Sequence, residues 1–126
     1  MVASELNVSF SYAERFAATQ SDALYPVAYR IPGALRETVR GKRVAIVNDV
    51  INAGSAVHGT FADLQICGAE TVAIGALLVL GPSATNFAAE RSVALESIAT
   101  LPNVVWTPSE CPLCAAGAPL NEPPGT

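Results

Sequence analysis

The sequence predicts an α/β fold built on a parallel sheet, on three observations. Val44–Val47 is rich in β-branched residues and lacks polar alternation, as expected for a strand covered on both faces. A turn of small residues and an amphipathic stretch ending at Gly68 follow it, and Thr71–Leu80 is a second apolar run. Strand, turn, helix, glycine and strand form a βαβ unit, so the two strands are predicted to be parallel. The α/β core is predicted to cover residues 44–106.

Two short segments ahead of this core predict a flexible hairpin over residues 9–31. Phe10–Phe16 has weak strand character, and Leu24–Ile31 contains a proline that restricts it to an edge strand. Between them, Ala17–Asp22 predicts a turn or mobile loop. A short helical stretch over Ala34–Val39 leads to the first core strand.

Less regular elements are predicted after the second core strand. Ser83 is placed as the N-cap of a helix over Ala84–Arg91. A second helical stretch is predicted over Leu95–Leu101, and a last short strand over Asn103–Trp106. The proline-rich and glycine-containing tail, residues 107–126, is predicted to be loop.

Composition excludes several classes of protein. Of the 126 residues, 51% are apolar and 14% are charged, whereas a disordered chain has fewer apolar and more charged residues. Seven basic against eleven acidic side chains, without a basic run, argue against nucleic-acid binding. The longest apolar run, Val72–Leu80, is far shorter than the ~20 residues of a membrane-spanning helix, and Met1–Glu5 is no secretion signal. Three cysteines, an odd number, indicate reduced thiols in the cytoplasm.

The segment Val44–Ala56 carries the clearest chemistry. Asn48 and Asp49 end a buried strand, so they are expected at the carboxyl edge of the sheet, where ligands bind in open α/β folds. Gly54-Ser55 then forms a small-residue turn into a helix. Small residues let backbone N–H groups approach a ligand, and a helix N-terminus favours negative charge. The segment therefore predicts a phosphate cradle.

This pattern resembles the motif that binds phosphoribosyl pyrophosphate (PRPP) in type I phosphoribosyltransferases. The version with Ala before Gly and a small residue after Ser is similar to that of orotate phosphoribosyltransferases. Val44–Leu80 follows the family through motif, helix and next strand, and Glu110–Leu120 resembles the end of a bacterial orotate phosphoribosyltransferase-like subgroup. The resemblance implies a parallel-sheet, Rossmann-like type I core that is incomplete at its N-terminus.

The resemblance also implies site residues. Asn48 and Asp49 are implied to bind the ribose hydroxyls and to be the catalytic pair, with Mg²⁺ accompanying PRPP. Backbone N–H groups after Ile51, with the Ser55 hydroxyl, are implied to bind the phosphate. The implied PRPP-binding set is Asn48, Asp49, Val50, Ile51, Asn52, Ala53, Gly54, Ser55 and Ala56. Asn52 is also a candidate base contact, and Arg15 is a candidate contact from the hairpin.

The implied activity is phosphoribosyl transfer from PRPP to a nucleobase by a cytoplasmic homodimer. With orotate, the products are orotidine 5'-phosphate and pyrophosphate, in pyrimidine nucleotide biosynthesis. Two features keep other interpretations open: Asn48 replaces the first acid of the family motif, and Lys42, the only lysine, abuts the strand rather than lying in a loop. The alternatives are a non-catalytic PRPP- or nucleotide-binding module, a truncated C-terminal fragment, or a structural dimer.

Other polar residues have simpler interpretations. Cys111-Pro-Leu-Cys114 is spaced like half of a zinc knuckle, and a symmetric dimer would supply the four ligands of a structural zinc site. A plain loop with two thiols is the favoured alternative. His58 is predicted to be solvent-facing or partly packed, and Asp63 and Arg36 are predicted to be solvated surface charges.

Overall fold

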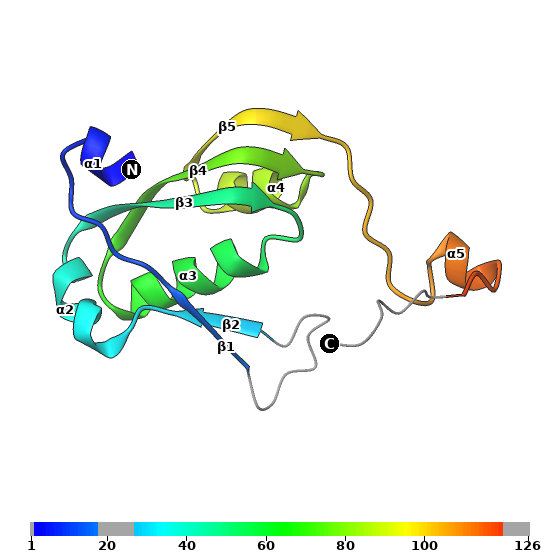
Figure 1. Ribbon diagram of the computed structural model, residues 1–126, viewed down its shortest axis with the longest axis horizontal. Helices are drawn as coiled ribbons and strands as arrows, with labels where there is room; N and C mark the ends of the chain where they lie inside the picture. Colours follow the sequence, from blue (N-terminus) through cyan, green and yellow to red (C-terminus); the bar gives the residue numbers. More distant parts are fainter. Residues whose placement is uncertain (1, 18–26, 120–126) are drawn as a thin grey trace.

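The computed structural model describes residues 2–17 and 27–119 and contains two sheets (Figure 1). In chain order, the elements are α1 (Val2–Glu5), β1 (Glu14–Ala17), β2 (Val27–Arg30), η1 (Gly33–Leu35), α2 (Arg36–Val39), β3 (Arg43–Ile51), α3 (Ser55–Ile66), β4 (Glu70–Leu80), α4 (Ser83–Glu90), β5 (Ala94–Leu101) and α5 (Pro112–Ala115). β1 and β2 pair antiparallel, and β3, β4 and β5 form a parallel sheet in that order. The predicted α/β class with a parallel sheet is confirmed.

β3, α3 and β4 form the predicted βαβ unit. β3 is longer than the predicted strand, because it continues through the polar pair to Ile51. Ile46 pairs with Ile74 and Ile51 pairs with Val79, and all four side chains are buried. Gly68, with φ 77°, follows α3 and reverses the chain toward β4 without the steric cost of a side chain.

The prediction of a helical stretch over Leu95–Leu101 is wrong, because this segment lies in strand β5. Its Ala, Leu and Glu residues are helix formers. In the structure the segment pairs in parallel with β4, and this pairing overrides local propensity. Ser92, with φ 55°, turns the chain between α4 and β5. The predicted strand over Asn103–Trp106 is not formed, since these residues have no strand conformation.

Helix α3 lies between the parallel sheet and the hairpin of β1 and β2 (Figure 1). Its apolar face contributes Leu64, which is 1% exposed, to the core. α4 lies beside α3, because the ring of Phe87 meets the edge of Phe61 with centroids 5.3 Å apart. On the hairpin side, a Cβ at Gly59 would lie 3.1 Å from the backbone nitrogen of Tyr29, so only a glycine allows this approach without a shift. Packing on both sides fixes α3 and the turn that precedes it.

The predicted hairpin is present, with shorter strands than predicted. β1 and β2 have four residues each, so β1 covers only the end of the predicted strand Phe10–Phe16. Residues 18–26 lie outside the described residues; they include most of the predicted turn Ala17–Asp22 and the start of Leu24–Ile31. The short helical stretch predicted over Ala34–Val39 is confirmed by η1 and α2.

The parallel sheet carries an exposed apolar surface. Val47, Leu77 and Ile98, one from each strand, line it and are 58, 59 and 82% exposed. Gly75 also lines this surface and adds no side chain to it.

The tail contains one helical turn, where the sequence predicted only loop. α5 begins after Cys111, whose sulfur accepts the backbone N–H of Cys114 at 3.5 Å, and Pro112 occupies the first turn, where its missing N–H costs nothing. Residues 120–126 of the predicted loop lie outside the described residues. None of the helices formed by residues 2–17 and 27–119 is long and apolar enough to cross a membrane.

Candidate functional site

The turn Asn52–Gly54 joins the carboxyl end of β3 to the first residue of α3. Gly54 is the N-cap of α3 and has φ 87°, a left-handed conformation that glycine adopts at little cost. Within the described part of the chain, the N-cap residue makes no side-chain hydrogen bond to the helix. The first N–H groups of an α-helix have no intrahelical acceptor, and the helix dipole favours an anion beside them. A left-handed glycine at a helix N-terminus is the backbone arrangement on which the predicted cradle depends, and phosphate binding by it stays a prediction.

Asn48 and Asp49 lie in the last part of β3, just ahead of this turn. Asn48 is half-buried and Asp49 is exposed. The Asn48 side-chain oxygen accepts the backbone N–H of Asp49 at 3.0 Å, and Asp49 Oδ1 accepts the N–H of Val50 at 2.8 Å. Each contact holds the side chain by one oxygen. Among the described residues no hydrogen bond engages the second carboxylate oxygen of Asp49, so it can accept from a sugar hydroxyl or bind a hard cation.

Two side chains from later in the chain hold the turn, and the sequence did not predict either role. Ser83 Oγ donates to the carbonyl oxygen of Ala53 at 2.9 Å, and Asn103 Nδ2 donates to Asn52 Oδ1 at 2.6 Å. The prediction of Ser83 as an N-cap is wrong, because Pro82 precedes the first residue of α4 as its N-cap. The short polar side chain of Ser83 suits either role, and only the folded sheet shows that its hydroxyl reaches the neighbouring turn.

His58 packs beneath the turn. A Cβ at Gly54 would lie 2.9 Å from His58 Nε2, and the imidazole stacks on Phe87 with ring centroids 4.0 Å apart. Burial, reinforced by the positive charge of Arg91, lowers the pKa of His58 below 6.5, although Glu90 opposes this shift. The imidazole is therefore neutral at pH 7 and supports the turn by packing, although its buried Nε2 has no hydrogen-bond partner in the described part of the chain; this agrees with the partly packed alternative.

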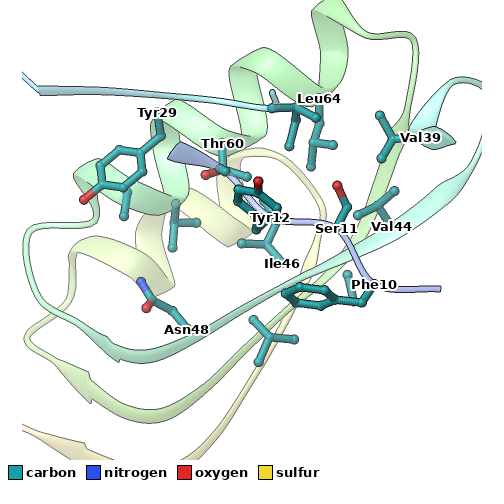
Figure 2. A pocket seen from close by; sticks show the side chains of 16 residues that line it. Phe10, Ser11, Tyr12, Tyr29, Val39, Val44, Ile46, Asn48, Thr60 and Leu64 are labelled. Carbon is teal, nitrogen blue, oxygen red and sulfur yellow. The ribbon is translucent and has the colours of Figure 1, made fainter. Parts of the chain in front are cut away.

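A cavity of about 300 Å³ lies beside β3 (Figure 2). Asn48 and Tyr29 lie at one end of it in Figure 2, and Val39 and Val44 lie at the other. Most of its lining is apolar or aromatic and comes from the N-terminal segment, β2, β3 and α3. Ala56 also lines it, so the cavity adjoins the residues of the predicted cradle.

Arg15 lies in β1, directly opposite Tyr29 of β2. Among the described residues, no hydrogen bond or ion pair joins Arg15 to residues 48–56. Its role as a contact from the hairpin stays a prediction.

The prediction that Asp63 and Arg36 are solvated surface charges is wrong. Asp63 is 5% exposed; its Oδ2 accepts the backbone N–H of Ile31 at 2.7 Å and pairs with Arg36 Nη1 at 2.9 Å. The hydrogen bond with Asp63 raises the pKa of Arg36 above its ordinary value. The contacts of Asp63 with Ile31 and Arg36 join α3 to the segment after β2, and they anchor the base of the hairpin.

Cys111 and Cys114 lie in and beside α5, which stands apart from the sheet in Figure 1. In the described ranges, no three His, Cys, Asp or Glu side chains gather as a metal site. The thiol of Cys111 instead serves as the cap of α5. The zinc half-site stays a prediction that needs a second pair of ligands.

Together these features define an α/β protein whose parallel sheet carries, at its carboxyl edge, the turn that was predicted as an anion cradle. No family model matches the chain. Curated relatives include the orotate phosphoribosyltransferase of Thermotoga maritima, 32% identical over 83 residues, which are 66% of this chain and 42% of that protein. That of Caldanaerobacter subterraneus is 31% identical over 87 residues, 69% of this chain and 44% of the relative. The chain thus spans less than half the length of these relatives.

Solved structures agree. The orotate phosphoribosyltransferase of Aeropyrum pernix matches 80% of this chain and 52% of its own, with 25% identity and a TM-score of 0.61. An adenine phosphoribosyltransferase from Thermoanaerobacter pseudethanolicus shares the fold, with a TM-score of 0.53 at 16% identity, over 79% of this chain and 61% of its own. The chain is thus similar in sequence to orotate phosphoribosyltransferases and has the type I phosphoribosyltransferase fold.

Proposed function

We propose that this chain binds PRPP and transfers its phosphoribosyl group to a nucleobase, with orotate as the acceptor that its relatives' names suggest. The observation that carries this proposal is the junction of β3 and α3. A polar pair ends a buried strand there, and a left-handed glycine opens a helix without a side-chain cap.

The phosphate of PRPP would lie at the start of α3. Backbone N–H groups of Ala53, Gly54, Ser55 and Ala56 would donate to its oxygens, with the Ser55 hydroxyl as a further donor. Gly54 has no side chain, and a Cβ there would meet the ring of His58, so this residue offers the ligand only backbone groups. Such backbone donors hold an anion without any basic side chain, which suits a chain of net charge −4.

The ribose would lie over the ends of Asn48 and Asp49, whose oxygens accept from its two hydroxyls. In the reaction the bond from C1 to pyrophosphate breaks and a bond from C1 to a base nitrogen forms. Pyrophosphate leaves with the electron pair, and the nitrogen loses its proton to solvent. The exposed Asp49 carboxylate suits the positive charge that develops on the ribose.

Mg²⁺ fits the same place by its chemistry, since carboxylate and phosphate oxygens are its preferred ligands. Bound with PRPP, it would neutralise the charge of the leaving pyrophosphate. Arg15 would contact the substrate from the hairpin, and Asn52 would contact the base. A homodimer is part of this proposal, and size-exclusion chromatography with light scattering tests it.

The test is a calorimetric titration of PRPP, with and without Mg²⁺, into the purified chain and its Asp49→Ala variant. Glu70→Ala is the matched control, because Glu70 is also an exposed carboxylate and begins β4 at the opposite edge of the sheet. Binding by the parent and the control, weakened about tenfold or more in Asp49→Ala, supports the site. Absence of binding by a folded parent contradicts it.

A PRPP-binding module without transferase activity is the second candidate, and Asn48 favours it. An uncharged amide replaces the first acid of the motif, and its oxygen already accepts the backbone N–H of Asp49, which leaves one lone pair for a ribose hydroxyl. An assay that follows conversion of orotate separates the two: binding without turnover indicates the module. If the missing negative charge at this position limits the reaction, Asn48→Asp should raise the activity.

A further inference from the structure

The acceptor groups of the turn Asn52–Gly54 are held by donors that lie outside the motif. Ser83 Oγ donates to the Ala53 carbonyl at 2.9 Å, across 30 residues of sequence. Asn103 Nδ2 donates to Asn52 Oδ1 at 2.6 Å, across 51 residues. Ser83 opens α4 directly after β4, and Asn103 follows β5. The carboxyl ends of all three parallel strands are therefore joined at this turn.

The direction of these hydrogen bonds matters for an anion. A carbonyl oxygen that faces a phosphate repels it, whereas an N–H group attracts it. The Ser83 hydroxyl engages the Ala53 carbonyl oxygen, and Asn103 engages the side-chain oxygen of Asn52. Both contacts hold oxygen atoms of the turn toward β4 and β5, so the N–H groups that follow can face the ligand together.

Gly81 is what allows Asn103 to reach the turn. A Cβ at Gly81 would lie 2.6 Å from the backbone oxygen of Asn103, and Gly81 has φ 69°. Its N–H donates to the carbonyl of Leu101 at 2.8 Å, which brings the chain after β5 alongside the end of β4. The close backbone approach at Gly81 and the contact of Asn103 with Asn52 are therefore parts of one arrangement.

We propose that Ser83 and Asn103 are positioning residues that orient the phosphate-binding turn, with Gly81 as the space that admits Asn103. Neither side chain needs to touch the substrate for this role. The inference rests on the proposed function for the identity of the anion, whereas the ordering of the turn is a property of the free chain.

The first experiment needs no ligand. Amide hydrogen exchange is measured by NMR in the free parent, Ser83→Ala, Asn103→Ala and the control Ser97→Ala. Ser97 lies in β5, and its hydroxyl contacts only Thr100 in the described chain, so this control removes the same group away from the turn. We expect about fivefold faster exchange in the two test variants at the amide of His58, which donates to the Gly54 carbonyl at 2.8 Å in the first turn of α3; this is the effect of one lost hydrogen bond. The amide of Leu64, in the middle of the core, should stay as slow as in the parent.

The second experiment titrates ribose 5-phosphate into the same chains. Ser83→Ala and Asn103→Ala should each weaken binding about fivefold, Ser97→Ala should not, and Ser83→Thr, which keeps the hydroxyl, should restore affinity. Asn52→Ala combined with Asn103→Ala should bind no worse than either single variant, because both remove the same hydrogen bond. A general loss of stability in the variants would not produce this non-additivity between Asn52→Ala and Asn103→Ala.

The outcomes separate the two proposals. Unchanged exchange at the His58 amide in both test variants overturns the positioning role, whether or not the parent binds ribose 5-phosphate. Parent binding with equal affinity in Ser83→Ala and Asn103→Ala overturns it as well and leaves the proposed function standing. Faster exchange at the His58 amide in the two variants, together with a parent chain that binds no ribose 5-phosphate, supports the ordering by Ser83 and Asn103 and contradicts the phosphate site.

Discussion

The two ends of α3 are held in different ways. Near its C-terminus, Asp63 is buried and bonds both Arg36 and the backbone of Ile31, so a charged network ties the helix to the base of the hairpin. At its N-terminus, single hydrogen bonds from neutral side chains hold the turn, and His58 supports it from below. The strong anchor lies away from the proposed site, and the weaker contacts leave the helix N-terminus open to a ligand.

The largest expected effect comes from breaking the anchored end. Asp63→Ala leaves the guanidinium of Arg36 and the N–H of Ile31 without their acceptor, and should cost about 3 kcal/mol of unfolding free energy. Urea unfolding followed by circular dichroism measures it. Glu37→Ala is the control: it removes an exposed ion pair with Arg40 and should cost about 0.5 kcal/mol or less. Equal losses of unfolding free energy in the two variants would contradict a larger contribution of the Asp63 network to stability.

The next largest effect on stability is expected at the N-terminal end of α3. Gly54→Ala forces a side chain into a left-handed residue, with its Cβ 2.9 Å from His58 Nε2, and should cost about 2 kcal/mol. Gly41→Ala is the matched control, since Gly41 has φ 66° and open space around its Cβ, and should cost about 1 kcal/mol. Thermal unfolding of both variants isolates the contribution of His58. A Gly54→Ala chain as stable as Gly41→Ala would show that the imidazole moves aside freely.

The two ends of α3 also differ in how far the sequence alone could predict them. The βαβ unit and the glycine-led turn follow from neighbouring residues, because strand, turn and helix signals are local. The burial of Asp63 depends on partners 27 and 32 residues away, and no local pattern marks them. β5 was missed for the same reason, since its strand conformation depends on pairing with β4. The proposed site residues were found from the motif, whereas Ser83 and Asn103 required the folded sheet.

A smaller effect is expected from pH at the open end. Because burial lowers the pKa of folded His58 below its unfolded value of 6.5, the unfolded chain binds more protons below this pH. The stability associated with neutral His58 is therefore complete above pH 6.5 and is lost as the pH falls through that value. Urea midpoints at about pH 7.5 and 5.5 should differ more for the parent than for His58→Gln, which cannot titrate. Identical pH dependence in the two chains would assign the change to other groups.

The smallest effect is kinetic and concerns the cysteines. Cys67 is buried at the C-cap of α3, whereas Cys111 and Cys114 lie at α5. The backbone N–H of Cys114 lowers the pKa of Cys111, and the hydrogen bond between the thiols raises that of Cys114. Alkylation at mildly alkaline pH, followed by mass spectrometry, should modify Cys111 first and Cys67 last. Early modification of Cys67 would mean that the anchored end of α3 opens more easily than its contacts indicate.

The apolar surface of Val47, Leu77 and Ile98 has a practical consequence for handling the purified chain. Salts that are excluded from protein surfaces strengthen apolar association, so sulfate and phosphate buffers should promote clustering of molecules through this surface. The same phosphate would compete for the proposed site. Dilute samples in chloride buffers are therefore the conditions in which a weak affinity for a sugar phosphate is easiest to observe.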